Sequence, residues 1–78
     1  MTPAYNPDVL GKVECHSSFA YIDRPVAFYW EGKRLLITEI EARWRLPDGR
    51  RFRVRVEDSR TFELYYDEPN DEWHIQIL

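Results

Sequence analysis

The sequence predicts an all-β fold, an antiparallel meander of consecutive hairpins. Apolar and polar residues alternate with a period of two over most of the chain from Pro25 onward, which is the pattern of a strand with one buried face. Turn-forming residues, among them Glu31-Gly32 and the Pro-Asp-Gly of residues 47–49, separate the alternating stretches. A chain of 78 residues has room for one domain.

The amino-terminal part carries weaker signals than the rest. Residues 1–10 hold two prolines and are expected to form an irregular lead-in, so that residues 11–78 form a single β domain. Residues 13–16 alternate and predict a short strand. Residues 17–24 lack this alternation and predict a loop that packs over the sheet edge.

Short sets of alternating apolar residues define the remaining strands. Together with the short strand before them, they predict a meander of five to six strands. Pro25 suits the first position of a strand, since proline has no N–H group to donate there. The sets are Val26, Phe28 and Trp30; Leu35 and Ile37; Ile40, Ala42 and Trp44; Phe52, Val54 and Val56; Phe62, Leu64 and Tyr66; and Trp73, Ile75 and Ile77.

One stretch changes phase, between Ile37 and Ile40. Because strand side chains alternate between two faces, this change requires a bulge or bend, expected around Thr38-Glu39. Such a bend lets a sheet turn a corner, so we expect the meander to curl into a small open barrel of the SH3-like kind. A helix over residues 35–45 is the competing interpretation; its β-branched and aromatic residues and the lack of caps disfavour it.

Matching apolar faces and opposite charges on neighbouring strands gives one expected register. Its pairs are Trp44–Phe52, Ala42–Val54, Ile40–Val56, Val56–Phe62 and Tyr66–Trp73, with Arg55 between Glu41 and Glu63. In this register Trp44 belongs to the core. Its replacement by alanine would then cost about 3–5 kcal/mol.

Arginines crowd the two strands on either side of the Pro-Asp-Gly turn, although the whole chain carries a net charge of −3. In the expected register like charges face each other, Arg43 opposite Arg53 and Arg45 opposite Arg51, and this arrangement costs stability. A phosphate or carboxylate partner would offset that cost, with Tyr65 as a stacking surface. The alternative is a solvated face that protects the sheet from aggregation. The candidate partner-binding residues are Arg43, Arg45, Arg51, Arg53, Tyr65 and His74.

Patterns for catalysis and metal binding are absent from the sequence. Cys15, His16 and His74 match no compact zinc spacing. Neighbouring strand residues point to opposite faces, so His16 is not placed to activate Cys15 as a nucleophile. The three glycines form no phosphate-binding loop. We therefore expect no enzyme activity, no metal and no cofactor.

The composition indicates where the protein is located and how stable its core can be. A single cysteine cannot form an intramolecular disulfide. No apolar run is long enough to cross a membrane, and the first residues lack the basic and apolar regions of a signal peptide. We expect a cytoplasmic protein without membrane contact. With 44% hydrophobic residues it can build a small core of modest stability, as a monomer or a weak homodimer.

Two segments carry a resemblance to a known family. Residues 25–34 (PVAFYWEGKR), with Ile40 and Trp44 after them, and residues 62–67 (FELYYD), with Trp73 after them, resemble a small uncharacterised bacterial family of all-β domains, a domain of unknown function. The likeness implies a compact β domain without catalytic residues. Some members are encoded near error-prone DNA polymerases, which implies an accessory role in DNA repair. The short connection between the two arginine-rich strands departs from members with longer, more aromatic insertions.

The sequence favours a non-enzymatic interaction module that binds a protein or an acidic partner through the arginine-rich face. The alternative is a nucleic-acid-associated accessory of DNA repair. Because the net charge is −3, we expect any attraction to nucleic acid to be local and weak.

Overall fold

The computed structural model describes residues 9–18 and 21–78 of the chain. The regular structure in these ranges is β-strand, which confirms the all-β antiparallel prediction, with seven strands in place of the expected five or six. No helix in the same ranges is long and apolar enough to cross a membrane. The strands are β1 (Val9–Gly11), β2 (Val13–Ser18), β3 (Tyr21–Trp30), β4 (Lys33–Leu46), β5 (Gly49–Val56), β6 (Thr61–Asp67) and β7 (Glu72–Ile77).

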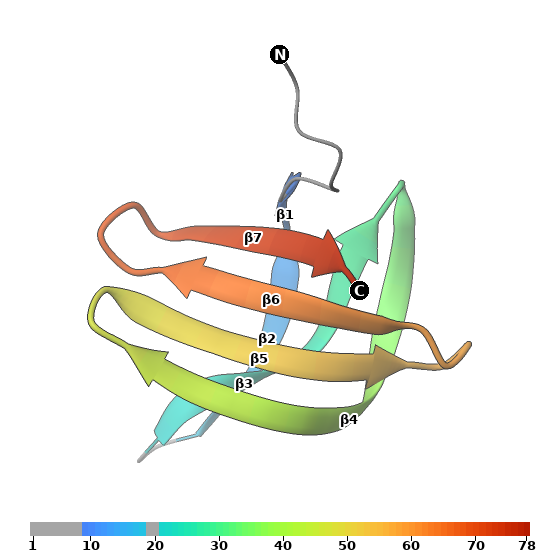
Figure 1. Cartoon of the computed structure of the whole chain (residues 1–78), viewed down its shortest axis with the longest axis horizontal. Helices are drawn as coiled ribbons and strands as arrows, with labels where there is room; N and C mark the ends of the chain where they lie inside the picture. The colour runs from blue at the N-terminus through green and yellow to red at the C-terminus, as the bar shows by residue number, and fades with distance from the viewer. Residues whose placement is uncertain (1–8, 19–20) are drawn as a thin grey trace.

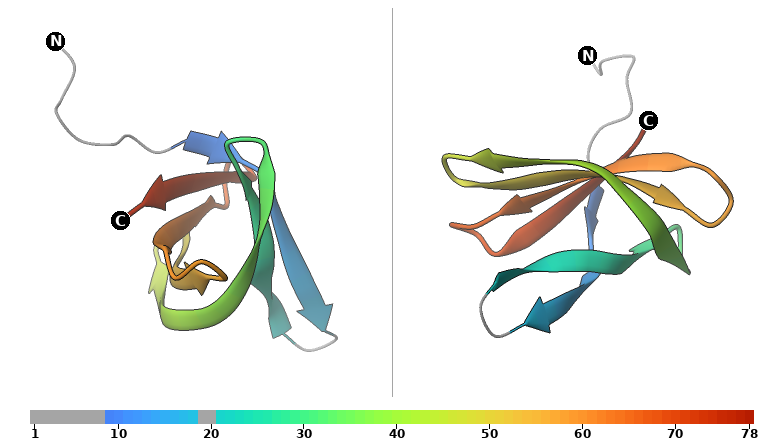
Figure 2. Two further views of the ribbon diagram at one scale, coloured as in Figure 1. Left: turned by 90° about the vertical axis from the view of Figure 1, so that its right-hand side faces the viewer. Right: turned by 90° about the horizontal axis from the view of Figure 1, so that it is seen from below.

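The strands form one antiparallel sheet that curls until its two edges approach each other. Its order is β1-β7-β6-β5-β4-β3-β2, and only Lys12 separates the edge strand β1 from the other edge strand, β2. The backbone N–H of Tyr29 in β3 donates a hydrogen bond to the carbonyl oxygen of Lys12, at 3.0 Å. The sheet is therefore a curled half-barrel (Figure 1), with β2 and β3 lying below the layer of β4 to β7 in the right-hand view of Figure 2.

The amino-terminal part contains more strand than its alternation indicates. At the end of the expected lead-in, β1 pairs with β7, with Val9 opposite Ile75. The prediction of a loop over residues 17–24 is wrong, because β2 and β3 continue through most of that range. Pro25 lies inside β3, opposite Cys15, at a shift of register. Such an irregularity accommodates a residue without an N–H group.

β4 is a strand of 14 residues that pairs with two neighbours. Its first residues pair with β3, and the part from Ile37 onward pairs with β5; the strand bends between them (Figure 2). The expected bulge is confirmed by a register shift between Ile37 and Glu39, where the Thr38 hydroxyl donates to the carbonyl oxygen of Arg55 at 3.1 Å. The competing helix over residues 35–45 is wrong, since this segment is strand.

The core lies on the inner face of the curled sheet. Phe62 makes edge-to-face contacts with Phe28 and Trp30, at ring-centroid distances of 4.9 and 5.2 Å. The predicted burial of Phe28, Phe52 and Phe62 is confirmed, whereas Trp30 and Trp73 are partly buried and pack against the core. The buried core residues of the described ranges are Ala27, Phe28, Phe52, Val54, Val56, Phe62, Leu64 and Ile75, and Pro25 is buried as well.

The prediction that Trp44 lies in the core is wrong. Its side chain is 40% exposed. Trp44 lies opposite Arg51, and Arg43 lies opposite Phe52, so this part of the β4–β5 pairing differs by one residue from the expected register. A slip of one residue moves a side chain to the other face of a sheet, which is why Trp44 lies outside.

Two local features set the observed β4–β5 register. The turn between these strands has two residues, because Leu46 pairs with Gly49, and the length of a hairpin turn fixes the pairing behind it. A second register shift directly after Ile40 leaves Glu41 without a partner in the ladder. The predicted contact of Glu41 with Arg55 is nevertheless formed, at 2.5 Å, because both side chains are long.

The β5–β6 register differs by two residues from the prediction. Phe62 lies opposite Val54 in place of Val56. A shift of two residues keeps every side chain on its face, so the core is unaffected. It does place Glu63 beside Arg53. The expected β6–β7 register is confirmed.

Candidate functional site

The structure divides the predicted partner-binding residues between the two faces of the sheet. Residues directly opposite each other on paired strands share a face. The outer face, which points away from the core, holds Arg51, Arg53, Tyr65 and His74, whereas the inner face holds Arg43 and Arg45. The expected like-charge neighbours Arg43–Arg53 and Arg45–Arg51 are therefore wrong, and the predicted single arginine face does not form.

Four consecutive cross-strand partners form what we call the outer row: Trp44, Arg51, Tyr65 and His74, one each from β4, β5, β6 and β7. Their side chains stack. The guanidinium of Arg51 lies 5.8 Å from the ring centroid of Tyr65, and the rings of Tyr65 and His74 are 5.7 Å apart. At the other end, the guanidinium of Arg53 lies 5.7 Å from the ring centroid of Trp44. The row thus places the arginine of β5 between the aromatic residues of β4 and β6, with a histidine on β7.

The two candidate arginines that lie on the outer face differ in their charge partners. Arg53 forms an ion pair with Glu63 at 3.0 Å, and its Nε is buried without a hydrogen-bond partner. Arg51 forms no ion pair within residues 9–18 and 21–78. It borders a shallow polar pocket lined by Arg51, Glu63, Tyr65, His74 and Gln76. Arg51 is therefore the cation of this face with most capacity for an added anionic group.

Tyr65 is held in place by the turn between β4 and β5. Its hydroxyl donates a hydrogen bond to Asp48 at 3.3 Å. Partial burial, together with the negative charge of Asp48, raises the pKa of Tyr65 above its ordinary value of 10.0. The phenol therefore stays neutral at physiological pH and keeps its ring orientation in the row.

A second cross-strand series, the inner row, crosses the same four strands on the opposite face. It consists of Arg45, Arg50, Tyr66 and Trp73. The guanidinium of Arg50 lies 5.8 Å from the Tyr66 ring centroid, and the rings of Tyr66 and Trp73 are 5.0 Å apart. Arg50 also reaches Glu68 at 3.6 Å.

Sequence reasoning missed four members of these rows: Trp44 in the outer row, and Arg50, Tyr66 and Trp73 in the inner row. The core assignment of Trp44 and Trp73 followed from their alternation alone. The two-residue turn is the signal that would have placed Trp44 outside, because it sets the β4–β5 pairing.

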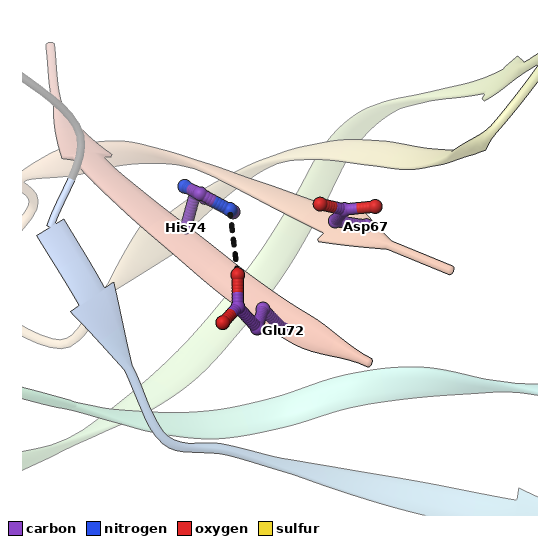
Figure 3. A group of neighbouring side chains, drawn as sticks. All are labelled: Asp67, Glu72 and His74. Carbon is purple, nitrogen blue, oxygen red and sulfur yellow. Dashed lines mark ion pairs between the residues drawn. The ribbon is translucent and has the colours of Figure 1, made fainter. Parts of the chain in front are cut away.

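Three metal-ligating side chains lie together at the β6–β7 end of the outer face, as Figure 3 shows: Asp67, Glu72 and His74. Their ligand atoms lie within 4.8 Å of one another, and His74 Nε2 is 3.8 Å from Glu72 Oε1. Asn70 donates a hydrogen bond to Asp67 at 2.8 Å. These protein contacts account for the arrangement, and we assign no metal to it. Neither Cys15 nor His16 belongs to the group.

Comparison of the chain with family models, with curated proteins and with solved structures finds no match. The resemblance carried by residues 25–34 and 62–67 thus stays a prediction.

Tyr66 gives a prediction for alkaline pH. Its hydroxyl donates a hydrogen bond of 2.6 Å to Asp71, and this bond, with burial second, raises the pKa of Tyr66 above 10.0. Because the pKa of Tyr66 is higher in the folded state than in the unfolded state, the neutral phenol stabilises the fold. This stabilisation is complete below about pH 10 and is lost as the pH rises through the pKa of Tyr66 in the folded state. Ultraviolet titration of the phenols should show a late step that Tyr66→Phe reduces. An unchanged titration curve for Tyr66→Phe would contradict this assignment.

Proposed function

We propose that this protein is a non-enzymatic, protein-binding module built on a small SH3-like barrel, and that the outer row is its recognition surface. The observation that carries the proposal is the exposure of Trp44 in a row with arginine, tyrosine and histidine on one face of the sheet. A tryptophan that is 40% exposed contributes little to the core, and it leaves apolar surface available to a partner.

The composition of the outer row matches the residues that dominate protein interfaces. Tryptophan, tyrosine and arginine are enriched among the positions whose truncation weakens binding most. Around the row lie polar and charged side chains, including Glu63, Gln76 and Asp67, which resemble the polar rim of an interface. Arg51, with its free capacity for an anion, suits a carboxylate on the partner.

The charge balance of the outer face favours a protein over a nucleic acid. Glu63, Asp67 and Glu72 share this face with the arginines, and the chain as a whole carries a net charge of −3. Nucleic-acid surfaces bind through phosphate neutralisation and are strongly basic. The accessory role in DNA repair that the family resemblance implies is therefore the alternative outcome of the test.

Two matched variants test the recognition surface. Trp44 and Leu36 both lie on β4, and each side chain is 40% exposed, so Leu36→Ala is the control that removes an apolar side chain of equal fractional exposure from the same strand. Tagged parent and variants would be used to capture proteins from a lysate of the native host. We expect Trp44→Ala to lose a partner that Leu36→Ala keeps, with the Kd of that partner raised about 30-fold or more.

Two results would contradict the proposal. The first is capture of the same proteins by the parent and by Trp44→Ala. The second is salt-dependent retention of the parent on single-stranded DNA that Arg51→Gln abolishes, which would favour the DNA-repair alternative. Thermal midpoints of all variants would be measured first, so that loss of binding is not confused with loss of fold.

A further inference from the structure

Three arginines gather on the inner face of the β4–β5 hairpin, opposite to the proposed recognition surface. Arg45 and Arg50 are direct cross-strand partners, and Arg43 lies two residues before Arg45 on the same strand face. Side chains directly opposite in an antiparallel pair have Cβ atoms about 4.5–5.5 Å apart. Positions two apart on a strand are separated by about 7 Å. Long arginine side chains at these positions can converge on one ligand.

The charges of this group are only partly compensated. Arg50 pairs with Glu68 at 3.6 Å, which is longer than a charge-assisted hydrogen bond. Its Nε is buried without a hydrogen-bond partner. Arg43 and Arg45 are exposed and form no ion pair with the residues that the structure describes. A like-charge cross-strand pair costs stability, so an anion bound here would be favoured by relief of that repulsion.

Aromatic rings continue the same row. Tyr66 lies directly beside Arg50, and Trp73 lies beside Tyr66, each with a partly buried ring. Several guanidinium groups next to aromatic surface are suited to a phosphate attached to a larger group, because arginine binds phosphate oxygens through two parallel N–H donors. A phosphate offers oxygens to several guanidinium groups at once, whereas a carboxylate has two.

We infer that Arg43, Arg45 and Arg50 form a binding site for a small phosphate-bearing ligand on the inner face of the β4–β5 hairpin. This site is independent of the proposed protein-binding surface, since it uses other residues on the other face of the sheet. The test uses inorganic pyrophosphate as the probe, added to the full chain at constant ionic strength, with the arginine Nε–Hε signals followed by nuclear magnetic resonance.

We expect saturable shifts of the three arginine signals on addition of pyrophosphate. Arg43→Gln combined with Arg45→Gln should weaken binding by about tenfold or more, because it removes charge-assisted hydrogen bonds. The control removes the same charge elsewhere, through Lys12→Gln combined with Lys33→Gln, and should leave the affinity within about twofold. Succinate, a dicarboxylate added at equal concentration and ionic strength, should bind more weakly than pyrophosphate.

Three outcomes would overturn the inference. One is a pyrophosphate response that is absent or not saturable. Another is an equal loss of affinity in both double variants, which would mean general charge attraction rather than a site. The third is binding of a single-stranded oligonucleotide through these arginines without any binding of pyrophosphate, which would assign the inner row to nucleic acid. Loss of binding at the outer row leaves this site untouched, so the two proposals fail separately.

Discussion

Replacing Phe62 by alanine is expected to destabilise the protein by about 3–5 kcal/mol, enough to unfold much of a small domain. The Phe62 side chain is fully buried. Its ring meets Phe28 and Trp30 edge to face at 4.9 and 5.2 Å, so truncation removes two aromatic contacts and leaves a cavity between the two layers of the sheet. Urea denaturation of parent and variant gives the difference in unfolding free energy.

Trp44→Ala is the control for this prediction. Because Trp44 is 40% exposed on the outer face, its truncation should cost about 1 kcal/mol or less. The core position that alternation alone indicates would have made it as costly as Phe62→Ala. Equal destabilisation by the two variants would therefore contradict the observed position of Trp44.

Gly49→Ala is expected to have the second large effect, a decrease of about 1–3 kcal/mol in the free energy of unfolding. Gly49 is the first residue of β5 and pairs with both Leu46 and Asp67. A Cβ atom at this position would collide with the carbonyl oxygen of Tyr66 and lie 3.1 Å from Cε1 of Tyr65. The obstacle is backbone, which cannot move aside without opening the β5–β6 pairing. A thermal melt of the variant measures the cost.

Gly32 provides the contrasting glycine. It has a φ of 82° in the β3–β4 turn, and a Cβ there would meet nothing within 4 Å. Asparagine tolerates this left-handed conformation, so Gly32→Asn should change the stability by only a few tenths of a kcal/mol. A tolerated Gly49→Ala, as mild as Gly32→Asn, would show that β5 and β6 do not approach each other as closely as the structure indicates.

Alternation in the sequence was sufficient to predict the strands from β4 to β7, because each has one face against the core. Ile75 and Leu64 are examples, both buried at alternating positions. The bulge near Thr38 was equally visible, since a change of phase has no other solution in a continuous strand. β1 and the ends of β2 and β3 could not be found in this way, because backbone pairing defines them: β1 pairs with the distant β7, and β2 pairs with β3.

The candidate site depended on register, which the pattern of apolar residues did not determine. Pairing Trp44 with Phe52 satisfied the apolar pattern, yet the two-residue turn and the shift after Ile40 pair Trp44 with Arg51 instead. One residue of slip was enough to divide the arginines between two faces. The neighbours Tyr65 and His74 were placed correctly because the β6–β7 register was right.

The central claim is that Trp44 lies on the outer face, in the row proposed as the recognition surface. The surroundings of its indole ring test this claim most directly, since the outer row exists only in the observed register. Nuclear Overhauser contacts of the Trp44 indole protons can be measured in the parent protein. We expect contacts to the side chains of Arg51 and Arg53, as the position of the Arg53 guanidinium 5.7 Å from the indole ring requires. Contacts from Trp44 to the ring of Phe52 would place the indole in the core, and both the register and the recognition surface would then be wrong.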